Sequence, residues 1–154
     1  MKNIIRITLA LILLGVVVRC ETDEACLSNQ HAVQATLLSA WWEEDTDTTL
    51  SDVSVIGLDM SDSIYNEESL SDLFLPLRFD TDTTSFIISN KTLKDTLHIV
   101  SAKELDFISG ECGYIFSFEI DTIMHSSAFI DSVSIIYPNI KYGETTENIK
   151  LYIY

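Results

Sequence analysis

Glycine and basic residues are scarce in this sequence, and each shortage excludes a class of function. Only five glycines occur among 154 residues, and none forms a glycine-rich phosphate loop or the glycine-flanked turn of a hydrolase nucleophile. Nine Lys and Arg stand against 24 Asp and Glu, which gives a formal net charge of −15. Because a field of that sign repels nucleic-acid phosphates, we expect no nucleic-acid partner.

No apolar run is long enough to cross a bilayer. The run at residues 7–18 follows Lys2 and Arg6. As a helix it would span only about 18 Å, short of the hydrocarbon core of about 30 Å. A basic start before a short apolar stretch is typical of an export signal. We therefore predict a signal peptide at residues 1–19, with a transmembrane helix as the weaker interpretation.

A cysteine follows the apolar run directly, in the letters Val-Val-Arg-Cys at residues 17–20. This arrangement resembles the lipobox of bacterial lipoproteins, in which the cysteine receives lipid and becomes the first mature residue. Arg19 departs from the small residue that the pattern has before its cysteine. The resemblance implies that Cys20 is lipidated. The alternative is an ordinary signal peptide with a free or paired Cys20.

Three acids lie among the four residues that follow Cys20, in the letters Glu-Thr-Asp-Glu at residues 21–24. This is similar to the acidic export signal of Bacteroidota surface lipoproteins, and a solvated tether is the alternative. We predict a tether at residues 20–31, at the outer membrane, on its surface or its periplasmic face. Residues 1–19 hold three basic residues and no acid, so removing them leaves six against 24, or −18. Membrane attachment then depends on the lipid.

Only three cysteines are present, which limits the possible bonds. If Cys20 carries lipid, Cys26 and Cys112 remain, and an isolated pair in an oxidising compartment is most simply a disulfide. Closing a loop of about 87 residues gives ~4–5 kcal/mol in the chain-entropy model. A nucleophilic Cys112 is the rejected alternative, because its neighbour Glu111 opposes formation of a thiolate.

Period-two alternation, rather than a helical stripe, runs through the remaining chain. Tyr114, Phe116, Phe118 and Ile120, for example, alternate with their neighbours. We predict strands at residues 32–42, 53–58, 73–79, 85–89, 96–102, 105–108, 114–121, 132–137 and 149–154, and turns at 43–49, 61–68, 80–84, 90–94, 109–110 and 139–145. Short strands with regular turns predict an all-β domain at residues 32–154, an antiparallel β-sandwich of about eight strands, Ig-like or related. Pro76 predicts that its strand lies at an edge or is bulged.

Several short motifs carry a family resemblance. They are Leu-Pro-Leu at residues 75–77, Thr-Leu-His-Ile at 96–99 and Glu-Cys-Gly-Tyr at 111–114, in addition to the lipobox-like cysteine. Together they resemble a family of small Bacteroidota lipoproteins defined as a domain of unknown function. The resemblance implies an exported, β-rich lipoprotein and brings no activity, cofactor or catalytic residue.

Asp-Thr motifs admit two kinds of modification or ligand. The letters Asp-Thr-Asp-Thr-Thr occur at residues 45–49 and 80–84. Calcium is one interpretation, but capping of turns by their own side chains is favoured, so no metal site is predicted. Triplets of Asp, Ser or Thr and then Thr or an apolar residue resemble the O-glycosylation acceptor of exported Bacteroidota proteins. Their loop copies predict Thr48, Ser63 and Thr83 as glycosylation sites, and chance occurrence is the alternative.

Trp41 and Trp42 are the strongest binding candidates in the sequence. If both lie on a strand, one ring points to the core and the other to solvent, and two partly buried rings are the alternative. We expect a structural or binding module for an envelope protein or a glycan, with no cofactor and no enzymatic activity. A hydrolase with a site assembled across strands is the alternative function.

Overall fold

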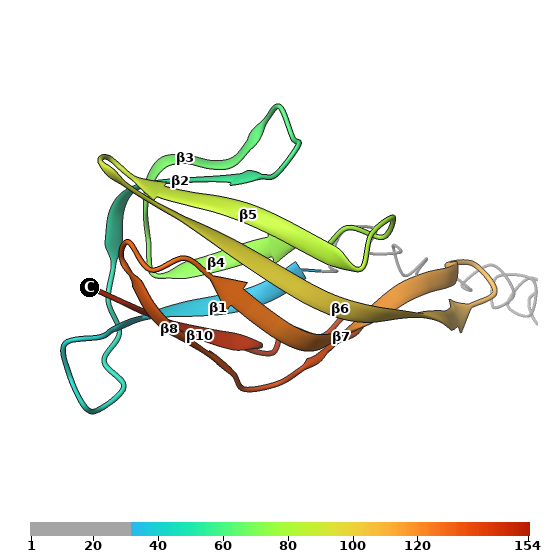
Figure 1. The fold of residues 1–154 in the computed structure, drawn as a ribbon. Coiled ribbons are helices and arrows are strands. Elements are labelled where there is room, and N and C mark those ends of the chain that lie inside the picture. The colour runs from blue at the N-terminus through green and yellow to red at the C-terminus, as the bar shows by residue number, and fades with distance from the viewer. Residues whose placement is uncertain (1–31) are drawn as a thin grey trace, which may run out of the picture.

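The part of the chain that the structure describes folds into ten strands, which form two sheets (Figure 1). The computed structural model describes residues 32–154, and these contain no helix. The strands are β1 (Ala32–Ser39), β2 (Leu50–Gly57), β3 (Ser63–Leu70), β4 (Asp72–Pro76), β5 (Thr83–Asn90), β6 (Leu93–Ser109), β7 (Gly113–His125), β8 (Ile130–Ile135), β9 (Asn139–Ile140) and β10 (Ile149–Ile153). The prediction of an all-β sandwich is confirmed.

The two sheets differ in size and in strand direction. The smaller sheet has the order β4-β1-β10-β8, and the larger one has the order β3-β2-β5-β6-β7-β9. β1 and β10 run parallel, from Ala35 opposite Ile149 to Ser39 opposite Ile153, whereas the other strand pairs are antiparallel. The sequence prediction had no parallel pair. Such a pair is possible here because β1 and β10 are not joined by a hairpin.

The core lies between the sheets and follows from the alternation along each strand. In β10, Ile149, Leu151 and Ile153 are buried, while the residues between them are partly exposed. Alternate residues point to opposite faces of a strand, so each strand supplies one apolar row. The rows that meet in the core include Val33, Ala35 and Leu37 from the smaller sheet and Val53, Val55, Phe86, Ile88, Leu97, Ile99, Phe118 and Ile120 from the larger one.

Two predictions about the first half of the domain have opposite outcomes. Residues 61–68 were expected to form turns, but most of them belong to β3, an edge strand that is largely exposed. Its polar composition hid it, because neither face of β3 carries a continuous apolar row. The edge position of Pro76 is confirmed, since β4 is the outermost strand of the smaller sheet and ends at Pro76, opposite Ala32.

β6 and β7 form a long hairpin whose outer part projects beyond the sandwich (Figure 1). β5 pairs with β6 only as far as Val100, and β9 pairs with β7 only at Phe118 and Glu119. Within residues 32–154, residues 103–109 and 113–117 therefore have strand partners only in each other, and we call this segment the arm. The predicted strand at residues 105–108 is the outer part of β6. Gly113, with φ of +69°, turns the chain back into β7.

A buried carboxylate connects the larger sheet to the loop that leads into β8. Asp95 of β6 is fully buried and accepts hydrogen bonds from the backbone N–H groups of Ala128, Phe129 and Ile130, each at 2.8 Å, and from the Ser126 hydroxyl. Burial raises the pKa of Asp95, but the hydrogen bonds from Ala128, Ser126, Phe129 and Ile130 outweigh burial and lower it below its ordinary value. Asp95 is thus an ionised structural anchor.

Asn148 plays a similar part at the other side of the sandwich. Its buried side chain accepts a hydrogen bond from the backbone N–H of Gln34 at 3.0 Å and donates to the carbonyl oxygens of Tyr137 and Asn139, both at 3.0 Å. One amide group therefore satisfies three backbone groups from β1 and from the segment around β9. Neither Asp95 nor Asn148 was predicted as a structural anchor.

Candidate functional site

Trp41 and Trp42 lie on the loop of residues 40–49 between β1 and β2, which we call the Trp loop. Their side chains are 72% and 67% exposed. The prediction that these residues extend the first strand is wrong, because β1 ends at Ser39. The alternation of the strand therefore does not reach either ring. Both rings face solvent, which differs from the expected inward and outward pair.

The Trp loop folds back on the strand from which it leaves. The backbone N–H of Ser39 donates to the carbonyl of Thr46 at 2.9 Å, and the N–H of Thr48 donates to the carbonyl of Leu37 at 3.1 Å. The N–H of Ala40 donates to the carbonyl of Ile153 at 2.8 Å. These bonds pair the backbone groups at the base of the loop, so the Trp pair starts from a fixed support.

Asp45 attaches the Trp loop to β10. Its carboxylate accepts a hydrogen bond from Lys150 Nζ at 2.7 Å and another from the Tyr152 hydroxyl at 2.9 Å. The bonds from Lys150 and Tyr152 lower the pKa of Asp45, and the bond to Asp45 raises the pKa of both Lys150 and Tyr152. Since all three stay in their bonding states at neutral pH, the attachment is intact there.

A third contact orients Trp41 itself. Its ring meets the ring of Tyr154 edge to face, with centroids 5.1 Å apart and planes at 69°. The Tyr154 hydroxyl donates to Asp131, which lies next to the start of β8. A shallow pocket of about 360 Å³ is lined by Trp41, Trp42, Glu43, Glu44 and Thr46. Its rings offer flat apolar faces for stacking, and its two glutamates can accept hydrogen bonds from hydroxyl or ammonium groups.

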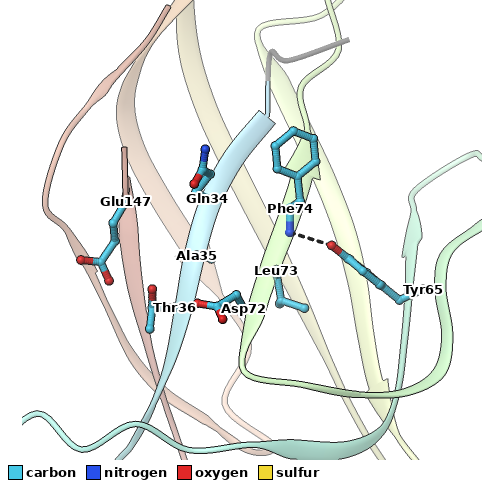
Figure 2. A pocket seen from close by; sticks show the side chains of 8 residues that line it. All are labelled: Gln34, Ala35, Thr36, Tyr65, Asp72, Leu73, Phe74 and Glu147. Atoms are coloured by element: carbon cyan, nitrogen blue, oxygen red, sulfur yellow. Dashed lines mark hydrogen bonds between the residues drawn. The ribbon is translucent and has the colours of Figure 1, made fainter. Parts of the chain in front are cut away.

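A second cavity, of about 210 Å³, lies where the edges of the two sheets meet (Figure 2). The Tyr65 hydroxyl reaches across from β3 and accepts a hydrogen bond from the N–H of Phe74 in β4 at 2.9 Å. The lining contains the carboxyl groups of Asp72 and Glu147, but no histidine, cysteine or lysine. The cavity is smaller than the ~300–1,000 Å³ typical of ligand pockets.

One serine–histidine contact bears on the hydrolase alternative. The Ser85 hydroxyl lies 2.7 Å from His98 Nδ1, and the two residues are direct cross-strand partners in β5 and β6. Alternation places them on the outer face of the larger sheet, because Phe86 and Leu97 beside them are in the core. Neither residue lines the cavity of Figure 2 or the pocket of the Trp loop. The contact is a polar cross-strand pair of the kind that stabilises sheets.

The other predicted residues fall in different places. Ser63 and Thr83 are exposed at the first positions of β3 and β5, whereas Thr48 is half-buried in the Trp loop. Cys20 and Cys26 lie outside the described residues, so lipidation and the Cys26–Cys112 bond stay predictions. Cys112 is half-buried in the turn at the tip of the arm, where its N–H donates to Ser109 Oγ at 3.0 Å.

Three of the four aspartates of the two Asp-Thr repeats are engaged in ion pairs. Asp80 pairs with Arg78 at 2.6 Å and Asp82 with Lys103 at 2.9 Å, in addition to Asp45 with Lys150. The Thr81 hydroxyl donates to the carbonyl of Thr83, a bond typical of a turn. Within residues 32–154, no group of three or more His, Cys, Asp or Glu is placed to hold a metal ion.

Residues 52–153 match the family of unknown function DUF6452. The chain belongs to this family. The DUF6452 match includes β3 to β10 and the arm but leaves out β1 and the Trp loop. Because β1 lies between β4 and β10, the matched residues do not complete the smaller sheet by themselves. No curated protein and no solved structure matches the chain. No helix among residues 32–154 is long and apolar enough to span a membrane.

Proposed function

We propose that this DUF6452 protein is a lipid-anchored binding module of a bacterial outer membrane. The Trp loop is its contact surface for a glycan or for another envelope protein. One observation carries the binding role: two neighbouring indole rings are exposed on a loop whose base is held by backbone and side-chain hydrogen bonds. Large aromatic groups on a rigid support are typical of binding hot spots, because little conformational entropy is lost when they engage a partner.

The position of the Trp loop agrees with an anchor that precedes β1. The eight residues of β1 run from Ala32 to Ser39 and span about 26 Å. The Trp loop follows β1 directly and lies on the side of the molecule opposite the arm (Figure 1). A lipid on Cys20 would therefore hold the start of β1 near the membrane and leave Trp41 and Trp42 directed away from it.

We expect the double substitution W41A/W42A to weaken binding at least about tenfold, since a hot-spot residue contributes ~2 kcal/mol or more. The full lipidated chain in detergent would be tested by glycan array with neutral and acidic oligosaccharides. Capture from a detergent extract of its own envelope, with and without glycosidase treatment, would be the second arm. If W41A/W42A loses an array signal that the unmodified chain gives, the partner is a glycan. If it loses one stoichiometric protein whose capture by the unmodified chain is unaffected by glycosidase, the partner is a protein.

The matched control is Phe74→Ala. Phe74 is also an exposed aromatic residue, but it lies in β4 opposite Gln34, away from the Trp loop. It should leave binding unchanged. If a partner binds W41A/W42A as well as the unmodified chain, or if F74A loses it equally, the Trp loop is not the contact surface.

Mass spectrometry of the protein purified from its own membranes tests the anchor and the covalent bonds. We expect a mature chain that begins at an acylated Cys20, a peptide pair joined through Cys26 and Cys112, and glycans, if present, at the exposed Ser63 or Thr83 in preference to the half-buried Thr48. A chain that keeps residues 1–19 and is recovered without lipid would contradict the anchor.

A further inference from the structure

Beyond Lys103, the arm carries an exposed apolar face. Leu105 lies opposite Phe116, and Phe107 lies opposite Tyr114. Side chains two residues apart share a face of a strand, so these four side chains form one continuous surface. Phe107 meets Tyr114 with ring centroids 5.3 Å apart, and Phe107 and Tyr114 are 61% and 66% exposed. Phe79 extends the surface, because its ring stacks on Phe116.

This face continues the core side of the larger sheet. Leu97 and Ile99 of β6 are fully buried, and the same alternation leads outward to Leu105 and Phe107. On β7, the buried Phe118 leads to Phe116 in the same way. The alternation is the same along the arm, but the smaller sheet does not extend over it, so this face is left uncovered. A two-stranded ribbon with an uncovered apolar face is marginally stable in water, so this face needs an occupant.

The opposite face of the arm carries acidic side chains. Glu104 and Asp106 alternate with Leu105 and Phe107, and Glu104 lies opposite Ser117. Ile108 and Ile115 share this face with the carboxylates, so one side of the arm is aromatic and aliphatic and the other is mixed, with the acids on it. This division fits a partner that is apolar on one side and wet on the other. Tyr favours the interfacial layer of a bilayer, where its ring is buried and its hydroxyl stays hydrated, and Phe and Leu are typical of the buried face of interfacial segments.

The arm also lies on the side of the molecule where β1 begins (Figure 1). Its seven β6 residues, 103–109, span about 23 Å. The chain from Cys20 to Ala32 reaches about 40 Å when fully extended. A lipid on Cys20 therefore brings the arm within reach of the bilayer. If Cys26 bonds to Cys112 at the arm's tip, the five residues between Cys20 and Cys26 limit that distance to about 18 Å.

We propose that the apolar face of the arm, formed by Leu105, Phe107, Tyr114 and Phe116 with Phe79, lies in the interfacial layer of the membrane that holds the chain. This inference rests on the lipid anchor of the proposed function. The lipid supplies the attachment, and an apolar face beside it adds a protein-borne contact with the same membrane. It also fixes orientation: the arm lies against the bilayer, and the Trp loop faces away from it.

Fluorescence quenching by brominated lipid tests this placement. The full lipidated chain is reconstituted into phosphatidylcholine vesicles with brominated acyl chains, as F107W and, in a matched variant, as D106W. Residues 106 and 107 are neighbours on opposite faces of the arm. F107W places one tryptophan in the bilayer beside two native ones at the far end of the sandwich. We expect it to lose roughly a third of its emission, and D106W and the native chain to lose little.

Each result decides between the claims. Equal quenching of F107W and D106W, or none in either, overturns the inference while leaving the anchor in place. A blue-shifted but unquenched F107W also overturns it and assigns the face to a second copy or to another part of the chain. A chain that does not float with the vesicles overturns the anchor and the inference with it. Quenching of the native tryptophans equal to that of F107W contradicts the orientation.

Discussion

Deleting residues 149–154 should leave a chain that does not fold. The deletion removes β10, which lies between β1 and β8 in the smaller sheet. It also removes three buried side chains, those of Ile149, Leu151 and Ile153. Burying one such side chain contributes ~1.5–3 kcal/mol, so their loss together approaches the 5–15 kcal/mol by which a domain is stable. The two neighbouring strands also lose their ladder partners. Circular dichroism and urea titration should show no cooperative transition.

Removing Tyr154 alone is the matched control. Its side chain is 57% exposed and lies beyond the end of β10. We expect a small change in the urea midpoint, from the loss of the contacts with Trp41 and Asp131. Leu151→Ala should fall between the two, at ~2–4 kcal/mol, because it leaves a cavity in the core without removing the strand. If the chain that ends at residue 148 still unfolds cooperatively, β10 is not required for folding.

Asp95→Ala should lower the free energy of unfolding by roughly 3–5 kcal/mol at pH 7, which after the deletion of β10 is the largest effect we expect. The substitution leaves the buried N–H groups of Phe129 and Ile130, and the part-buried N–H of Ala128, without their acceptor. Each unpaired buried donor costs ~1–3 kcal/mol before relaxation. Urea unfolding of the full chain measures the difference. Asp121→Ala is the control, because Asp121 also stands before a threonine in a strand but is exposed, and its loss should stay within ~0.5 kcal/mol.

The same substitution should change the response to acid. The pKa of Asp95 is lower in the folded than in the unfolded chain, so its ionised form stabilises the fold above the unfolded carboxyl pKa of about 3.9. That contribution is lost as pH falls from there through the folded pKa. The difference between the native chain and D95A should therefore be constant from pH 5 to 7 and shrink below about pH 4. A difference that does not vary with pH would show that the Asp95 charge is not involved.

Most strands were predictable because alternation is a local property. Residues 114–121 and 149–154 show it clearly, and they lie within or around β7 and β10. β3 was missed because an exposed edge strand needs no apolar row. Alternation also predicts which residues share a face without saying whether another sheet covers that face. For this reason the Leu105 and Phe107 pattern gave no sign that the arm extends past the core.

The residue types of the candidate site were predictable, but the contacts that hold the Trp loop in place were not. Trp41 and Trp42 stand out in any reading of the sequence, but their exposure depends on where β1 ends. Asp45 and Lys150 are 105 positions apart, and no local pattern relates them. Asp95 shows the same limit. In the sequence it precedes a threonine, as several other aspartates do, and only the hydrogen bonds from the folded loop at residues 126–130 set it apart from them.

The parallel pairing of β1 with β10 has a consequence for how the protein is made. The N–H of Gln34 in β1 bonds to Asn148, 114 positions later. β1 therefore cannot pair with β10, one of its two neighbours, until almost the entire domain has been synthesised. Contacts of such long range form slowly, because a large loop must close first. Until β10 is in place, one edge of β1 stays unpaired, so a chain interrupted before residue 149 leaves a strand edge open to pairing with other chains.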